Sequence, residues 1–167
     1  RSVRGLFEDD PFRFLPRMNS GNINLSVPVR IYNDDLSSGL GDAYGVLMLP
    51  ESYSSEGEPT RLIIYCHGSG THYTPGTNQF TDGSPLDPTL FLSEGYAVMD
   101  IDGNPFDNTH PSFYIPESLP CYIAAYNYVT ERFNIKRDGV ILGGRSMGGS
   151  MCIELLQSGE IPVIACF

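Results

Sequence analysis

The sequence contains few residues of several kinds, and each shortage argues against a class of protein. No run of about 18 or more apolar residues occurs, so no membrane-spanning helix is predicted. Lys136 is the only lysine, and the 167 residues carry a net charge of −10. Binding to nucleic acid requires positive charge that neutralises phosphates, so this balance argues against such a partner. Acidity that only aids solubility is the better explanation of the charge, and we expect a soluble globular domain.

Cysteine is also scarce, and its placement predicts neither a metal site nor a disulfide framework. The four cysteines are Cys66, Cys121, Cys152 and Cys166, and no cluster of His, Cys, Asp and Glu has metal-ligand spacing. We expect the four to be buried free thiols that pack as small apolar residues, which favours a reducing compartment. No signal peptide is visible, and the start at Arg1 suggests that upstream residues were removed or left out. The localisation is otherwise open.

Apolar patterning divides the chain into alternating strands and helices. Strands are expected at 22–31, 43–49, 61–66, 96–101, 140–142 and 161–167, and helices at 88–94, 117–133 and 147–157. Pro28 suggests an edge position for the first strand, and Ser118 before Pro120 suits the start of the longest helix. Strands separated by helices predict an α/β fold with a mostly parallel sheet and helices on both faces. Residues 1–21 fit this plan poorly, and we expect them to form an N-terminal arm or a linker.

The segment from Gly139 to Met151 carries the strongest chemical signal. It reads as a short apolar strand, then the pentapeptide Gly-Arg-Ser-Met-Gly at 144–148, then a helix. A G-x-S-x-G sequence between a strand and a helix is typical of a nucleophile elbow, in which a sharp turn holds the serine oxygen up into a cleft. Gly144 and Gly148 avoid side-chain clashes at such a turn, and Gly149 allows the helix to pack closely on the sheet. We interpret Ser146 as a catalytic nucleophile.

A second motif lies upstream, where the apolar stretch 61–66 leads directly into His-Gly-Ser-Gly at 67–70. A glycine-rich turn leaves backbone N–H groups uncovered, and such groups stabilise the oxyanion of an acyl-transfer intermediate. A chance G-x-S-x-G is common in a chain with 18 glycines. Two motifs, each at the C-terminal end of a strand, together favour the catalytic interpretation.

Over residues 40–167 the chain resembles the α/β-hydrolase family, in particular its esterase and lipase-like members. The resemblance rests on four segments, Tyr44–Pro50, Ile63–Gly70, Gly95–Asp100 and Gly144–Gly148. It implies that residues 22–167 are the N-terminal part of a hydrolase domain, which stops after the strand that follows the nucleophile helix. It also implies that Ser146 is the nucleophile and that the Met147 amide is one oxyanion donor. The second donor would be Gly68, Ser69 or Gly70, of which we favour Ser69.

The sequence departs from the family pattern in its histidines. The family triad follows the chain order serine, acid, histidine, but His67, His72 and His110 all precede Ser146. His67 is expected to close its strand and support the oxyanion turn, and His72 is a weak substitute for the base. The simplest explanation is that the acid and the histidine lie in a missing C-terminal part, or that a second chain completes the fold. We expect the fragment alone to be inactive and prone to association.

Two loops after predicted strands would shape the substrate pocket, because ligands of open α/β sheets bind at the carboxyl ends of the strands. The candidate substrate-binding residues in these loops are His72, Tyr73, Phe106, His110 and Tyr114. They suit a sugar ring or an aromatic acyl group, although aromatic residues that only anchor long loops would look the same.

These observations predict a serine hydrolase that cleaves small-molecule carboxylic esters through an acyl-enzyme and needs no cofactor or metal. A peptidase of the same fold remains open, because the elbow does not distinguish an ester from an amide. A non-catalytic binding or structural module on the same scaffold also remains open.

Overall fold

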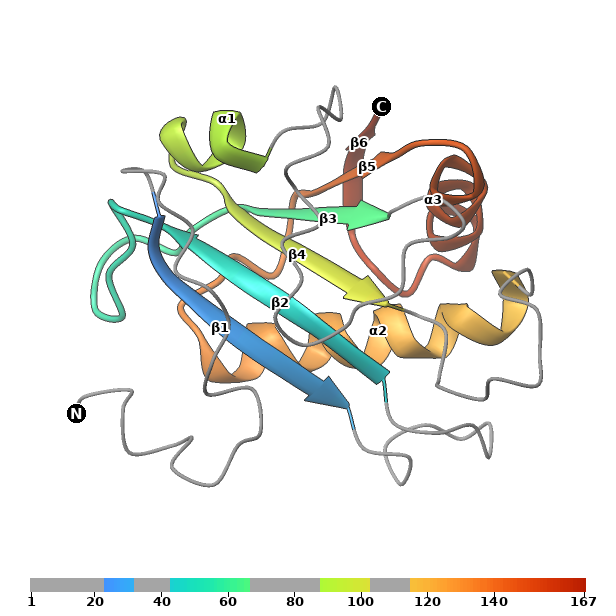
Figure 1. Ribbon diagram of the computed structural model, residues 1–167, viewed down its shortest axis with the longest axis horizontal. Helices are drawn as coiled ribbons and strands as arrows, with labels where there is room; N and C mark the ends of the chain where they lie inside the picture. Colours follow the sequence, from blue (N-terminus) through green and yellow to red (C-terminus); the bar gives the residue numbers. More distant parts are fainter. Residues whose placement is uncertain (1–22, 32–42, 67–87, 103–114) are drawn as a thin grey trace.

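The computed structural model describes residues 23–31, 43–66, 88–102 and 115–167, and these form one six-stranded sheet with helices packed on it (Figure 1). The strands are β1 (Ile23–Ile31), β2 (Ala43–Pro50), β3 (Leu62–Cys66), β4 (Ala97–Asp102), β5 (Val140–Gly144) and β6 (Val163–Cys166). Their order across the sheet is β1-β2-β4-β3-β5-β6. β2 pairs antiparallel with both β1 and β4, whereas the pairs β3–β4, β3–β5 and β5–β6 are parallel. The expected mostly parallel sheet is therefore confirmed.

Three helices are described, and they cover both faces of the sheet. The helices are α1 (Pro88–Ser93), α2 (Ile115–Arg132) and α3 (Met147–Ser158). Successive residues of a strand point to opposite faces, so each strand supplies two sets of side chains. One set packs with α2 and α3 in the larger core, and the other packs with Leu92 of α1 in a smaller core. None of these three helices has the length and apolarity that crossing a lipid bilayer requires.

Strand β3 lies in the middle of the parallel part and is buried on both faces. Its residues Leu62, Ile63 and Ile64 are almost fully buried, although they alternate between the two cores. A continuous apolar run is typical of a strand covered by helices on both sides. Each such side chain contributes about 1.5–3 kcal/mol through burial. The C-terminal end of β3 therefore continues from a strand that is buried on both faces.

The observed elements agree with the predicted ones except at some boundaries. The edge position predicted from Pro28 is confirmed, because β1 is the first strand of the sheet. The predicted start of the longest helix at residue 117 is wrong, since α2 begins at Ile115 and contains Pro120. Pro116 occupies the second helical position, where a missing N–H costs nothing, so this proline and not Pro120 marks the start. β5 extends two residues further than predicted and ends at Gly144.

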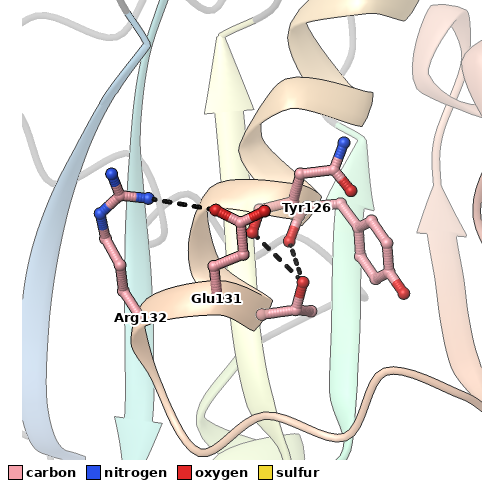
Figure 2. A network of polar contacts seen from close by, with 5 residues as sticks. Tyr126, Glu131 and Arg132 are labelled. Carbon is pink, nitrogen blue, oxygen red and sulfur yellow. Dashed lines mark hydrogen bonds and ion pairs between the residues drawn. The ribbon is translucent and has the colours of Figure 1, made fainter.

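Polar groups near the C-terminal end of α2 contact one another, as Figure 2 shows around Tyr126, Glu131 and Arg132. The Thr130 hydroxyl donates a hydrogen bond to the Tyr126 carbonyl at 2.9 Å. Glu131 and Arg132 form an ion pair at 3.8 Å, and both side chains are more than half exposed. An exposed pair of this kind adds between zero and about 1 kcal/mol. After the helix, the Asn134 amide donates hydrogen bonds to two carbonyls of the turn at 51–60, at 2.9 and 2.8 Å.

Candidate active site

The turn between β5 and α3 holds one residue in a strained backbone conformation. Ser146 lies just before the first residue of α3 and has φ 57° and ψ −123°. Among the described residues it is the only non-glycine residue with a positive φ. A side chain at such angles costs about 1–3 kcal/mol, so the surrounding structure must hold it there.

The packing of the turn explains why Gly144 precedes it. A Cβ atom on Gly144 would lie 2.4 Å from the Gly148 carbonyl oxygen and 2.7 Å from the sulfur of Cys152. Both distances are too short for any side chain, so glycine at 144 lets the first turns of α3 approach the end of β5. Gly148 is buried, whereas Ser146 is exposed. The turn therefore directs the serine away from the sheet.

The groups displayed by this turn are a hydroxyl and backbone amides at a helix N-terminus. The Ser146 hydroxyl makes no capping hydrogen bond to α3. The Gly148 and Gly149 amides donate to the carbonyls of Arg145 and Ser146, each at 2.9 Å. The Met147 amide is the first of the helix, and amides of a first turn have no acceptor within it. The helix dipole places a partial positive charge at the same end of α3. The free amide and this charge together favour a negative charge next to Ser146.

Strand β3 ends beside the β5–α3 turn. β3 runs parallel to β5, and Cys66, its last residue, pairs with Gly144. The segment that follows Cys66 contains the oxyanion candidates Gly68, Ser69 and Gly70. These three residues lie outside the described residues, so their position as oxyanion donors stays a prediction. The candidate substrate-binding residues His72, Tyr73, Phe106, His110 and Tyr114 also lie outside them.

Sequence reasoning missed a cluster of thiols beneath the turn. Cys66 of β3 and Cys166 of β6 each interact with Cys152 of α3, which lies between them. All four cysteines are free, and three are buried as expected, but the expected burial of Cys166 is wrong because it is exposed. Cys166 lies on β6, the last strand in the order of the described sheet. In the described part of the chain, no three His, Cys, Asp or Glu side chains could hold a metal ion.

No family model matches the chain, and no curated protein does so either. Solved structures match it at low identity. Dienelactone hydrolase from Anabaena variabilis is 19% identical with a TM-score of 0.58, over 85% of this chain and 61% of that one. S-formylglutathione hydrolase from Agrobacterium tumefaciens is 16% identical with a TM-score of 0.63, over 89% of this chain and 58% of that one. Acylaminoacyl peptidase from Pyrococcus horikoshii is 17% identical with a TM-score of 0.54, over 80% of this chain and 21% of that one.

The chain thus covers less than two thirds of the length of each of these three structures. At such identities the matches establish the arrangement of the backbone and leave the chemistry to the site itself. Together with the mostly parallel sheet and the helices on both of its faces, these matches show that the chain has the α/β-hydrolase fold.

Proposed function

We propose that this protein is a serine hydrolase that cleaves carboxylic esters through an acyl-enzyme, with Ser146 as the nucleophile. The backbone of Ser146 carries the proposal, since a non-glycine residue at φ 57° persists only where the structure enforces it. Such strain is concentrated at functional sites. The exposed hydroxyl, which no helix cap engages, is available to attack a carbonyl carbon. Similar solved structures include two hydrolases and a peptidase, which supports hydrolysis as the reaction class.

The oxyanion of the tetrahedral intermediate would be held by two backbone amides. The Met147 amide is one, because it begins α3 directly after the nucleophile. The second comes from the turn after β3, where Ser69 is favoured over Gly68 and Gly70. The parallel pairing of Cys66 with Gly144 supports this assignment, because it brings the carboxyl ends of the two strands together. An oxyanion-hole donor of this kind lowers the activation barrier by about 2.7–4 kcal/mol.

The general base has no candidate after Ser146 in these 167 residues. A serine hydroxyl needs a base to accept its proton. We propose that a histidine and its orienting acid come from outside the sequence given, either from a longer chain or from a second chain. His72, which follows the motif at 67–70, is the weaker alternative within the sequence.

The proposed substrate is a small ester, with His72, Tyr73, Phe106, His110 and Tyr114 as contacts for its acyl or alcohol group. A peptidase is the second candidate, favoured by the similarity to acylaminoacyl peptidase. The two differ in the leaving group, because an amide nitrogen must be protonated to leave whereas an alkoxide from an activated ester leaves readily. Paired p-nitrophenyl esters and peptide p-nitroanilides distinguish them.

A fluorophosphonate probe tests the nucleophile, because it labels only a serine that is activated for attack. Protein made from the complete natural coding sequence is expected to be labelled and to hydrolyse p-nitrophenyl esters. The variant Ser146→Ala should lose both labelling and turnover. Ser150→Ala is the matched control, since Ser150 is an exposed serine one turn further along α3. Equal labelling of the two variants would refute the assignment of Ser146.

The coding sequence itself is the first measurement, together with the intact mass of the natural protein. A later Asp or Glu followed by a His would supply the missing base, and alanine at that His should abolish turnover. A natural chain that stops at residue 167, with no partner chain and no labelling, would overturn the enzyme proposal. A non-catalytic binding module would then be the better interpretation.

A further inference from the structure

A basic side chain is attached to the chain directly before Ser146. Arg145 lies between Gly144, the last residue of β5, and Ser146, which precedes the first residue of α3. The Arg145 carbonyl accepts a hydrogen bond from the Gly148 amide at 2.9 Å, so the first turn of the helix holds the backbone of Arg145 in place. The Cα atoms of Arg145 and Ser146 are about 3.8 Å apart, as in any trans peptide. The strained turn therefore fixes the base of the arginine side chain next to the serine.

The packing of Gly144 indicates the direction in which the Arg145 side chain leaves the turn. A Cβ on Gly144 would meet the Gly148 carbonyl and the sulfur of Cys152, so α3 fills the space on that side of the strand. Successive residues of a strand point to opposite faces, and Arg145 follows Gly144 directly. The Arg145 side chain is therefore directed away from the side that α3 fills, and it is exposed, as is Ser146.

The charges around this turn are of one sign. The helix dipole places a partial positive charge at the amino end of α3, and the first turn of α3 contains no acidic residue. Arg145 adds a full positive charge to the same end. The whole chain has 20 acidic and only 10 basic residues, so the charge at the turn is opposite to the net charge of the protein. The turn is therefore a local site of attraction for an anionic group.

The guanidinium group of arginine suits a particular kind of anion. It is planar and presents its N–H donors as a fork that matches the two oxygens of a carboxylate. The two hydrogen bonds of such a pair are charge-assisted, and they are stronger than hydrogen bonds between neutral groups. A substrate with a free carboxylate would gain this interaction, whereas a neutral substrate of the same shape would not.

We propose that Arg145 is a specificity-determining residue that binds a carboxylate of the substrate, so that the preferred substrates are half-esters of dicarboxylic acids. This inference rests on the proposed function, because it assigns a substrate class to a hydrolase whose nucleophile is Ser146. The ester carbonyl is attacked by Ser146, and the free carboxylate, a few bonds away on the acyl chain, binds the neighbouring guanidinium. Arg145 takes no part in making or breaking bonds.

Two esters that differ only in charge test this preference. One is the mono-p-nitrophenyl ester of adipic acid, and the other is its analogue in which a carboxamide replaces the free carboxylate. Protein made from the complete natural coding sequence is assayed with both, and release of p-nitrophenolate gives kcat/KM for each. We expect the anionic ester to be preferred by about tenfold, equivalent to about 1.4 kcal/mol. Higher ionic strength should reduce this preference, because salt screens exposed charges.

Variants of Arg145 connect the preference to the guanidinium. In Arg145→Gln the ratio of the two kcat/KM values should fall close to one. Arg145→Lys should keep part of the preference, because lysine retains the charge but lacks the fork. Arg61→Gln is the matched control and should keep the ratio of the parent. Arg61 is also exposed, but it lies directly before β3, at the amino end of that strand, whereas Ser146 follows the carboxyl end of β5.

The possible failures of the two proposals can be distinguished. A parent protein that hydrolyses both esters equally well, or an Arg145→Gln variant with an unchanged ratio, would overturn the role of Arg145 and leave the serine hydrolase intact. Loss of activity toward both esters in a folded Arg145→Gln variant, with circular dichroism as the check, would show that Arg145 supports the turn and does not select substrates. A parent that cleaves neither ester and is not labelled by a fluorophosphonate would overturn both proposals.

Discussion

The strain at Ser146 can be measured by replacing this residue with glycine and with alanine. Alanine removes the hydroxyl and keeps a Cβ at φ 57°, whereas glycine removes the hydroxyl and the Cβ together. The two variants therefore differ in the cost of holding a side chain in this conformation. The difference in their free energies of unfolding reports that cost and is independent of any catalytic role.

The expected difference follows from two opposing terms. Glycine has no Cβ and adopts this backbone conformation without strain. Replacing alanine by glycine here should therefore raise the free energy of unfolding by about 1–3 kcal/mol. Glycine also makes the unfolded chain more flexible, which costs the folded state about 0.4–1 kcal/mol. The first term is the larger, so we expect Ser146→Gly to be more stable than Ser146→Ala by about 1 kcal/mol, within the span of about 0–2.6 kcal/mol that the two ranges give.

Urea unfolding of the two variants gives this difference, provided that the slope of the free energy with urea stays the same. Ser150 supplies the control, since it lies within α3 at ordinary helical angles. There glycine should be less stable than alanine by about 0.8–1 kcal/mol, the usual helical penalty. The sign of the glycine effect should therefore reverse between positions 146 and 150. If glycine destabilises both positions equally, Ser146 is not strained and the argument for an enforced turn fails.

Three further changes test the packing around the site and the core. Gly144→Ala should lower the free energy of unfolding by at least about 1–3 kcal/mol, because the new Cβ would clash with α3. Gly149→Ala should leave stability unchanged or raise it, because a Cβ there would lie 3.7 Å from its nearest neighbour, the Gly144 carbonyl oxygen. Thermal unfolding compares the two variants. Asn134→Ala removes two hydrogen bonds to the turn at 51–60 and should lower stability by about 1–2 kcal/mol, measured by urea unfolding. Tyr126→Phe loses a hydrogen bond to a backbone carbonyl, worth about 1 kcal/mol at neutral pH. Burial raises the pKa of Tyr126 above 10.0, so the stability linked to its neutral form is complete below pH 10 and decreases as the pH rises through the higher folded value. The phenylalanine variant should therefore lose stability less steeply than the parent above pH 10, and an equal slope in both proteins would contradict this.

Local sequence patterns were sufficient to predict the elements of this fold. Alternation of polar and apolar residues marked β1, and a proline within it indicated an edge strand, because proline cannot complete a ladder of hydrogen bonds on both sides. Continuous apolar runs marked β3 and β5. The start of α2 was misplaced because two prolines, Pro116 and Pro120, can each begin a helix, and sequence alone does not choose between them.

The glycines at fixed spacing between a strand and a helix predicted a sharp turn at Ser146, and the family resemblance added Met147 as an oxyanion donor; both roles stay predictions. The sequence could not show that the Ser146 backbone is held at a positive φ, since that angle depends on how closely α3 packs against Gly144. The interactions of Cys152 with Cys66 and Cys166 could not be predicted for a related reason. Cys66 and Cys152 are 86 residues apart in sequence, and only the order β3-β5-β6 beneath α3 brings their sulfurs together with that of Cys166. Local patterns determine which segments become strands and helices, but the chemical environment of a side chain is set by neighbours that only the packed sheet supplies.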